Sequence, residues 1–295
     1  MEEDVRAESI YRGVGAWRSM ILASFIACAV YAVSVTLPTL VTAAALASIR
    51  DRGLLTVCAH PDALPFSSQN STLHGFELDL AEAIARSLGV RLQVNWIVFA
   101  RHARRADCDV VMASIVQGRV GVSREAAEEG DTDQAQNGNE GVVGAGLTKP
   151  YASNGYVLVV STPIRDIPDL AEWKGGKVGV EHGSWPHYLL NQQGIPTTSY
   201  LNQPEILDAV ARGEVAAGLV TNPHAGWFLK QHPGALRIST ASMPADLRWN
   251  VSVRVLNGDP ALLGALNDSL DRLIADQTLA RIFSQYGFPY APPRP

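Results

Sequence analysis

The stretch that covers residues 54–89 is LLTVCAHPDALPFSSQNSTLHGFELDLAEAIARSLG, and it predicts a strand, an open loop and a helix in that order. Residues 54–59 form a short apolar run with the composition of a buried strand, and the turn-forming tripeptide HPD ends it. From Phe76 the apolar side chains recur at helical spacing, and Gly89 is placed as the C-terminal cap. In open α/β sheets, ligands bind beyond the carboxyl ends of the strands. The loop that contains Phe66 is therefore expected at a binding crevice.

The chain after residue 89 keeps alternating strands and helices. Residues 90–96 alternate apolar and polar side chains as a half-buried strand does, and DVVMAS at 109–114 is the next buried strand. This β-α-β-α-β order is typical of a parallel sheet. A strand at 155–160 is expected to cross into a second lobe, where the alternation is repeated. We expect further helices near 167–173, from 184, at 203–212, through 227–229 and after Pro260 and Thr278, and further strands near 177–180, 197–200, 217–220, 236–239 and 249–255.

The alternation predicts an α/β protein with two lobes joined by crossing strands. We assign residues 48–155 and 250–295 to lobe 1 and residues 156–249 to lobe 2, each with a mostly parallel sheet flanked by helices. Residues 117–146 are poor in large apolar side chains and rich in Gly, Asn, Asp and Glu, so an insertion or surface loop is expected there. The final PYAPPRP is expected to be a disordered end. The cleft between two hinged lobes is the default small-molecule site.

The composition indicates a folded protein that does not bind nucleic acid. Of the 295 residues, 47% are hydrophobic and 18% are charged, which is ordinary for a globular protein. The net charge is −5, and no long basic block is present. Because phosphate binding needs a cationic surface, nucleic acid is not an expected partner.

The N-terminal segment, residues 1–47, is predicted to be an export signal or a membrane anchor. Residues 19–47 are almost wholly apolar, and this length favours an uncleaved anchor. The tripeptide ALA at 45–47 has the small-x-small pattern of a cleavage site and favours a signal peptide. Lipid attachment at Cys28 is a third alternative. All three place the chain from residue 48 onward in the periplasm, with membrane contact only through residues 19–47.

Two cysteines remain once this segment is set aside, Cys58 and Cys108. A compartment outside the cytoplasm permits disulfides. The pair is therefore expected either to bond or to lie as two small buried hydrophobic side chains on neighbouring strands. Neither cysteine has the local spacing of a metal site, and we expect neither a metal nor a cofactor.

Several motifs, taken in order, resemble the bacterial periplasmic solute-binding proteins of family 3, which include the polar amino acid receptors of ABC importers. They lie between residues 54 and 288 and are LTVCAHPDALPF, GFELDLAEAIARSLG, DVVMAS, LTKPYASNGYVLVV, WKGGKVGVEHGSW, NQPEILDAVARGEVAAGLV and DQTLARIFSQYGF. The resemblance implies a type 2 periplasmic-binding fold, with lobe boundaries near Tyr156 and near Asn250.

Within that family, VCAHPDALPFS, CDVV and LTKPYASNGYVLVV look most like a subgroup found beside quinoprotein alcohol dehydrogenases. These are the J-type accessory proteins of methanol oxidation systems. The likeness implies a periplasmic quinoprotein dehydrogenase or its cytochrome as a partner. The subgroup usually has Asp where this chain has His60, and the insertion at 117–146 is not part of its pattern.

The family resemblance also implies how a ligand would be held. In amino acid receptors of the family, an Arg shortly after the DVVMAS-type strand binds the ligand carboxylate, and here only Arg119 or Arg124 could do so. An acidic residue of the second lobe binds the ammonium, but this chain has Thr221 at that position. A buried ammonium without a carboxylate partner is costly. We therefore expect that ordinary α-amino acids are not tight ligands.

The other candidate ligand contacts lie at predicted strand ends and helix starts, and each has an ordinary structural alternative. Gly183 and Ser184 offer amide donors to an anionic or carbonyl group, or Ser184 only caps a helix. Phe66 stacks on a ligand or fills the core of lobe 1, and Trp185 forms a cleft wall or a partner surface. The full set of candidate ligand-binding residues is His60, Phe66, Glu77, Ser114, Arg119, Gly183, Ser184, Trp185 and Thr221.

An enzymatic function has little support in the sequence. His60 and Glu77 could form an acid/base pair. However, the chain has no GxSxG elbow, HExxH motif, P-loop or dinucleotide fingerprint. We predict a non-enzymatic, periplasmic binding-type protein. The predicted function is that of an accessory factor of a quinoprotein dehydrogenase, which the loss of the amino acid anchor favours. The alternative, which the two-lobed frame favours, is an ABC-transporter receptor for a small polar solute that is not a standard α-amino acid.

Overall fold

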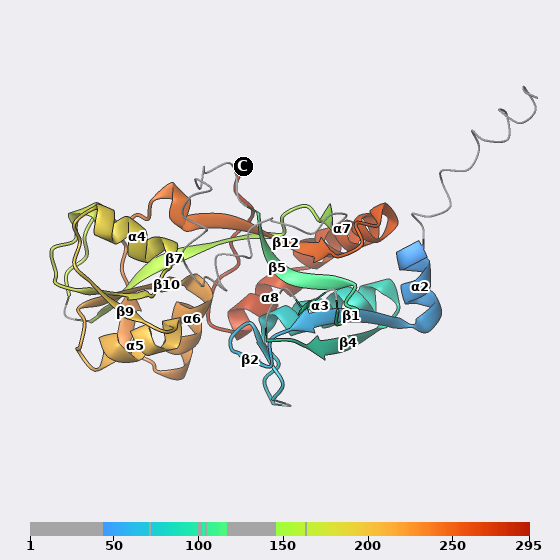
Figure 1. Cartoon of the computed structure of the whole chain (residues 1–295), viewed down its shortest axis with the longest axis horizontal. Helices are drawn as coiled ribbons and strands as arrows, with labels where there is room; N and C mark the ends of the chain where they lie inside the picture. Colours follow the sequence, from blue (N-terminus) through green and yellow to red (C-terminus); the bar gives the residue numbers. More distant parts are fainter. Residues whose placement is uncertain (1–43, 71, 99–101, 104, 117–145, 163) are drawn as a thin grey trace, which may run out of the picture. The chain divides into compact units, whose positions relative to one another are not determined.

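The computed structural model describes residues 44–70, 72–98, 102–103, 105–116, 146–162 and 164–295. Almost all of the predicted export segment and of the predicted insertion therefore lies outside the described residues, as do Arg119, Arg124 and Cys28. Ala45–Pro295 forms one compact unit (Figure 1).

The first lobe is built on the strand, loop and helix that the opening stretch predicts. β1 (Leu54–Ala59) pairs in parallel with β4 (Arg91–Trp96) on one side and with β5 (Val110–Val116) on the other. α3 (Phe76–Leu88) connects β1 to β4, and Gly89 ends it in the left-handed conformation that glycine adopts without strain. The loop before α3 contains a short hairpin, β2 (Asp62–Ala63) and β3 (Ser67–Ser68).

Two long strands join the lobes. The first part of β7 (Ala152–Ser161) pairs with β12 (Arg248–Val255), and its later part pairs with β10 (Ala217–Thr221) and β11 (Leu236–Ile238). β12 also pairs with β5 and with β6 (Gly146–Leu147) of lobe 1. The strands therefore follow the order β4-β1-β5-β12-β7-β10-β8-β9, and Figure 1 shows β7 and β12 passing between the two groups of elements. We keep the lobe boundaries near Tyr156 and Asn250 as our own assignment.

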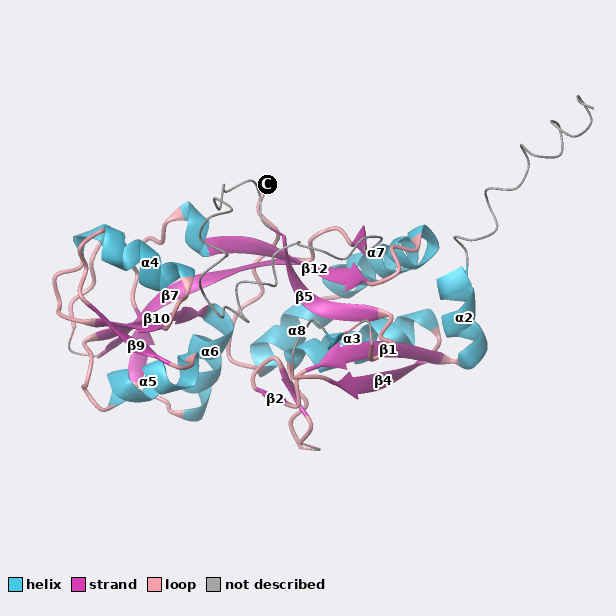
Figure 2. Cartoon of the chain, viewed as in Figure 1, coloured by secondary structure: helices cyan, strands magenta, loops and turns pink. Residues whose placement is uncertain are grey.

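The second lobe repeats the parallel arrangement. β8 (Val178–Glu181) pairs in parallel with β9 (Thr197–Tyr200) and with β10. α4 (Trp185–Gln192), α5 (Gln203–Ala211) and α6 (Asn222–Gln231) flank these strands (Figure 2). Proline stands in the first turn of all three helices, where its missing N–H costs nothing.

The helix predicted near 167–173 is wrong in extent. The structure has only a single 3-10 turn there, η4 (Leu170–Glu172). Pro168 precedes the turn, and Gly175 and Gly176 follow closely, so little chain is left to continue it. A second such turn, η5 (Ala245–Leu247), leads into β12.

The C-terminal return to lobe 1 consists of α7 (Pro260–Ala275), α8 (Thr278–Gln285) and an ordered tail. The prediction of a disordered end is wrong. The Ser153 N–H donates to the Ala291 carbonyl at 2.9 Å, and Asn250 and Arg294 exchange two hydrogen bonds of 2.9 Å. The two crossing strands therefore hold the proline-rich tail. This pairing over long sequence distances cannot be recognised from the composition of the tail.

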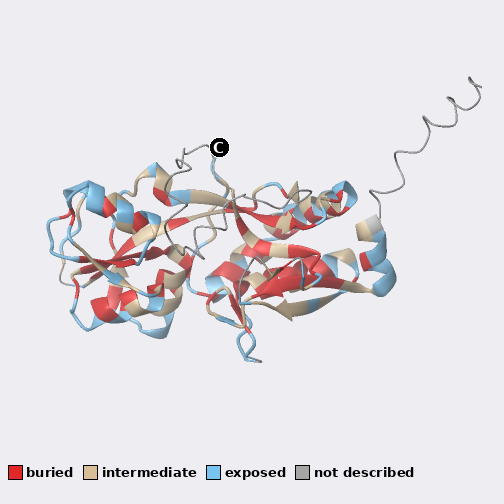
Figure 3. Cartoon of the chain, viewed as in Figure 1, coloured by how far each residue is buried: buried red, intermediate tan, exposed pale blue. Residues whose placement is uncertain are grey.

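The core of lobe 1 is mostly aliphatic and contains a cluster of aromatic rings. The ring of Phe76 lies 5.3 Å from Phe283 and 5.0 Å from Phe288, in edge-to-face contacts. These contacts join the start of α3 to α8 and the tail. Figure 3 shows buried residues concentrated on the strands and on the helix faces that cover them.

The first described helix, α2 (Ala44–Arg52), packs on lobe 1. Ile49 is fully buried, and the backbone N–H groups of Ala45 and Leu46 donate to Asp259 Oδ2 at 2.8 and 3.3 Å. The predicted cleavage tripeptide at 45–47 thus lies within this helix. Among the residues that the structure describes, no helix has the length and apolar character needed to span a bilayer.

Candidate functional site at the junction of the lobes

A small cavity lies where the crossing strands meet the starts of α3 and α6. Its lining includes Phe76 at the start of α3, Ala113 on β5, Tyr151 just before β7, and Asn222 at the start of α6. Both lobes thus contribute to it. The cavity is mostly apolar, with a few hydroxyl and amide groups that could orient a ligand, as is usual for small-molecule sites.

None of the predicted site residues that the structure describes lines this cavity. Glu77, Ser114 and Thr221 each follow or precede a lining residue in the chain. Because side chains alternate or rotate along an element, the adjacent residue presents its side chain elsewhere. Tyr151 and Asn222, which line the cavity, were not among the predicted residues.

Phe66 contacts the second lobe. Its ring centroid lies 5.2 Å from that of Phe76 and 5.1 Å from the imidazole of His224 on α6. The core-filling role and the cleft role considered for Phe66 are therefore both compatible with its position. His224 Nδ1 lies 2.8 Å from the Thr221 hydroxyl, and burial lowers the pKa of His224 to about 4.

Glu77 lies in the first turn of α3, and its N–H donates to the Phe66 carbonyl at 3.1 Å. Burial raises the pKa of its carboxyl to about 7. Burial, and after it the charge of Glu77, raise the pKa of the Tyr151 hydroxyl. This carboxyl and this hydroxyl form the most perturbed titratable pair near the cavity.

His60 and Ser114 both take part in local structure, His60 in a turn and Ser114 in the sheet. The Asp62 N–H donates to His60 Nδ1 at 3.1 Å, and the His60 carbonyl accepts a hydrogen bond of 2.8 Å from the Ser67 hydroxyl. His60 therefore stabilises the turn after β1, and in the described structure no hydrogen bond joins it to Glu77. Ser114 is buried opposite Ser252 in the β5–β12 pair.

The group Gly183, Ser184 and Trp185 lies at the start of α4 and lines no part of the cavity described above. The Ser184 hydroxyl donates to the Glu181 carbonyl at 2.7 Å and accepts from the His187 N–H at 3.4 Å, while the Gly183 N–H donates to His187 Nδ1 at 3.3 Å. These donors are occupied, which matches the capping alternative. Trp185 is 39% exposed, and its Nε1–H donates to Asp246 at 3.1 Å.

A buried hydrogen-bond network joins Thr221 to Gln203 and Glu181, and it was not expected from the sequence. The Thr221 N–H donates to Gln203 Oε1 at 2.7 Å, and Gln203 Nε2 donates to Glu181 Oε2 at 3.3 Å. Glu181 is 6% exposed at the end of β8, and its charge adds to burial in raising the pKa of Tyr156. The only signal in the sequence was the carboxylate at the end of the apolar strand VGVE.

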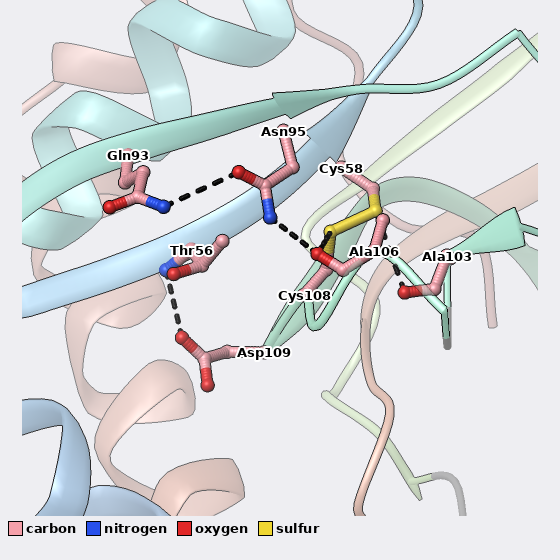
Figure 4. Close-up of a disulfide and its surroundings, with 8 residues drawn as sticks. All are labelled: Thr56, Cys58, Gln93, Asn95, Ala103, Ala106, Cys108 and Asp109. Carbon is pink, nitrogen blue, oxygen red and sulfur yellow. Dashed lines mark hydrogen bonds between the residues drawn. A yellow bond between two sulfur atoms is a disulfide. The ribbon is translucent and has the colours of Figure 1, made fainter.

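Cys58 and Cys108 are joined as a disulfide that ties the end of β1 to the start of β5, with a Cα–Cα distance of 5.6 Å (Figure 4). Both residues are buried. Beside them the Thr56 N–H donates to Asp109 at 2.8 Å, and Arg52 forms an ion pair with Asp109. The described residues contain no group of three or more His, Cys, Asp or Glu side chains arranged to hold a metal ion.

The chain is similar to known solute receptors, although no family model matches it. It is 25% identical over 249 residues to the L-cystine-binding protein of Escherichia coli (strain K12), a match that covers 82% of this chain and 85% of that protein. The L-cystine solute receptor of Neisseria gonorrhoeae, solved in an unliganded open conformation, is 21% identical with a TM-score of 0.64. That match covers 85% of this chain and 100% of the receptor.

A third similarity is to part of an enzyme. The membrane-bound lytic murein transglycosylase F of Desulfosudis oleivorans (strain DSM 6200 / JCM 39069 / Hxd3) is 26% identical over 248 residues, which are 81% of this chain but 49% of that protein. Since only about half of the transglycosylase is matched, its activity does not carry over to this chain.

Together with the observed topology, these comparisons confirm the two-lobed α/β periplasmic-binding fold, with mostly parallel strands and flanking helices. They also support the resemblance to solute-binding proteins. These three relatives are two solute receptors and a transglycosylase, and they give no support to the quinoprotein-associated subgroup.

Proposed function

We propose that this protein is the periplasmic solute receptor of an ABC importer. The observation that carries the proposal is the cavity lined from both lobes at the crossing strands, where Phe76 of α3 and Asn222 of α6 face the same space. A two-lobed protein with its site at the junction can close around a small ligand by a hinge motion. The similarity to L-cystine receptors supports a small polar solute.

The ligand is proposed to differ from that of an ordinary amino acid receptor. Thr221 stands where the family resemblance implies an acidic residue, and its backbone N–H and hydroxyl are bound to Gln203 and His224. It offers no charge to an α-ammonium group. We therefore keep the expectation that common α-amino acids, L-cystine included, bind weakly, and micromolar binding of any of them in calorimetry would contradict it.

The receptor function can be tested by screening the protein isolated from the periplasm against polar solutes. Binding is followed first by the rise in melting temperature and then by calorimetry. The variants Asn222→Ala and Phe66→Ala should lose most of the affinity. Leu201→Ala is the matched control, because Leu201 is 81% exposed and should not affect binding. The proposal fails if no solute stabilises the protein or if both variants bind as the unmodified chain does.

A second proposal, an accessory factor for a quinoprotein dehydrogenase, is favoured by a specific surface. On α4, Trp185 and Tyr188 are 39% and 53% exposed, with ring centroids 5.3 Å apart. Exposed aromatic side chains are enriched at protein interfaces. This proposal also accounts for the loss of the acidic residue at Thr221.

A pull-down from periplasmic extract separates the two proposals. Recovery of a quinoprotein dehydrogenase or its cytochrome, identified by mass spectrometry and lost with a Trp185→Ala and Tyr188→Ala double variant, would establish the accessory function. Permease and ATPase genes beside the gene for this chain would favour import. Dehydrogenase and cytochrome genes would favour the accessory function.

A further inference from the structure

The start of α2 is bound to lobe 1 by one buried carboxylate. Asp259 is 5% exposed, and its Oδ2 accepts the N–H groups of Ala45 and Leu46 at 2.8 and 3.3 Å. The first N–H groups of a helix have no partner within that helix, so they need an acceptor such as this one. The negative charge of the carboxylate is also favourable at this end of a helix. Residues 45 and 46 are therefore held by a specific contact of the folded lobe.

The apolar face of α2 is packed as well. Leu46 is half-buried against the hydrophobic core of lobe 1, and Ile49 is fully buried. Their spacing of three residues places both on the same face of the helix. Ala47 and Ser48, which lie between them in the chain, are exposed. Helix α2 is thus part of lobe 1 from its first turn onward.

A cut after Ala47, at the end of the predicted cleavage tripeptide ALA, would remove this first turn. The Oδ2 atom of Asp259 would lose both of its backbone donors, and a buried polar group without a partner is unfavourable. Residues 48–52 would leave roughly one and a half helical turns, too few to form a stable helix by themselves. Ile49, which is fully buried, would become the second residue of a fraying end.

The sequence also contains a tripeptide at which a cut would preserve the contact. TAA at 42–44 has the same small-x-small pattern as ALA, and it ends directly before Ala45. A cut after Ala44 would make the nitrogen of Ala45 an α-ammonium group at the position where its N–H now lies 2.8 Å from Asp259 Oδ2. An ammonium group can donate to the same carboxylate and adds a favourable charge. The sequence pattern fits both tripeptides, and the contact with Asp259 favours the upstream one.

We propose that residues 45–47 remain in the exported protein and that any processing cut falls on the N-terminal side of Ala45. A chain that keeps its export segment as a membrane anchor also meets this condition, because α2 then stays whole. The proposal depends neither on the ligand nor on the partner, so it holds for a receptor and for an accessory factor alike.

The test determines the N-terminus of the protein that is made from the full-length gene and isolated from the periplasm and from membranes. N-terminal sequencing and intact mass are expected to show a first residue at Ala45 or earlier. A first residue at Leu46 or later, Ser48 included, overturns the proposal.

The variant Ala47→Gln gives a second readout of the same question. Processing needs a small residue directly before the cut, and the side chain of Ala47 is exposed, so that Gln can replace it without a clash. The N-terminus of Ala47→Gln should be that of the unmodified protein. A shifted N-terminus or a block of processing would show that the cut follows Ala47, and would overturn the proposal.

The contact with Asp259 is tested by treating the isolated protein with a non-specific aminopeptidase and following its intact mass. The unmodified protein should keep residues 45–47. Asp259→Asn should lose them roughly five- to tenfold faster, because its single amide oxygen cannot accept from both helix starts and proteolysis follows local opening. Asp271→Asn is the matched control, since Asp271 lies on α7 with its side chain 62% exposed.

Equal rates for Asp259→Asn and Asp271→Asn would overturn the proposed role of Asp259, and so would loss of residues 45–47 from the unmodified protein. If Asp259→Asn does not accumulate as a folded protein, the N-termini of the unmodified chain and of Ala47→Gln decide the question.

Discussion

The imidazole of His224, on α6 of lobe 2, lies 5.1 Å from the phenyl ring of Phe66, in the loop that follows β1 of lobe 1. The same imidazole is bound through Nδ1 to the Thr221 hydroxyl, and Phe66 is packed against Phe76. An ionisable ring is therefore held in an apolar contact between elements of the two lobes. The neutral form of His224 belongs to this arrangement, which gives the protein a defined response to pH.

We predict that replacing His224 with Gln removes a loss of stability at acid pH. The pKa of His224 is lowered from 6.5 to about 4 in the folded protein. The unfolded chain therefore binds more protons between these values, and the contribution of His224 to stability, complete above about pH 6.5, is lost as the pH falls toward 4. One unit of pKa corresponds to about 1.4 kcal/mol, so the loss is expected to be on the order of 2 kcal/mol. Urea unfolding at pH 7.5 and pH 5 measures the loss. If the free energy of unfolding falls equally between these pH values in the unmodified protein and in His224→Gln, the prediction is contradicted.

Glu77 is predicted to act in the opposite direction. Its pKa is raised from 4.5 to about 7. Its contribution to stability is therefore complete below about pH 4.5 and is lost as the pH rises through 7. Glu77→Gln should make the protein more stable at pH 8, by on the order of 1–3 kcal/mol, and leave it little changed at pH 4.5. The same unfolding series measures this effect, with Glu82→Gln as the exposed control. A destabilised variant at pH 8 would show that the carboxylate has a partner when ionised.

Local signals account for what the sequence predicted correctly. The apolar run before His60, the helical stripe from Phe76 and the glycine at 89 each act within one element, and the structure places β1, α3 and its cap where they indicate. Ser184 and Pro260 likewise begin α4 and α7 as capping rules require. The order of these elements along the chain was sufficient to predict the two-lobed fold.

The candidate site was less predictable, because its contacts join distant parts of the chain. The Thr221–Gln203 hydrogen bond and the packing of Phe66 against His224 connect residues with no shared periodicity. In the sequence Tyr151 is one of several aromatic residues near predicted strands, and only the fold reveals that it is buried and lines the cavity. The donors at Gly183 and Ser184 looked available in the sequence, but the structure occupies them within the α4 cap.

The disulfide is predicted to be a major source of stability. Cys58 and Cys108 are separated by 50 residues, so the bond closes a long loop of the unfolded chain. A chain-entropy estimate for a loop of that size is about 4 kcal/mol. The double replacement Cys58→Ser and Cys108→Ser should lower the free energy of unfolding by roughly this amount, and a reductant should destabilise the unmodified protein but not the variant. Free thiols in the protein isolated from the periplasm would contradict the bond.

Asp259 is predicted to anchor the starts of two helices of lobe 1, α2 and α7. Its Oδ1 accepts the N–H groups of Ala261 and Leu262 at the start of α7, and its Oδ2 accepts those of Ala45 and Leu46 at the start of α2. Burial tends to raise the pKa of Asp259, but the four backbone donors lower it below its usual value.

Replacing Asp259 with Ala removes the cap of two helices. The free energy of unfolding is expected to fall by about 2 kcal/mol, since one cap contributes about 1 kcal/mol. Chemical unfolding measures the loss. Asp271→Ala, on an exposed part of α7 where Lys149 lies 3.7 Å away, should cost less than 1 kcal/mol as a surface ion pair. Equal effects of the two substitutions would show that the Asp259 cap does not bind α2 and α7 as described.

Gly226 is predicted to be required for the packing of α6 against the end of α8. A Cβ at this position would lie 2.5 Å from the carbonyl oxygen of Gly287. This oxygen belongs to the backbone, so relieving the overlap requires the chain itself to shift. Although Ala is a better helix former than Gly, Gly226→Ala should destabilise the protein by about 1–3 kcal/mol through this overlap. Gly264→Ala is the matched control, because a Cβ there meets nothing within 4 Å in α7 and should stabilise the protein by about 0.5–1 kcal/mol. Melting temperatures that move in opposite directions for the two variants would support the close approach of the two backbones, and a stabilising Gly226→Ala would rule it out.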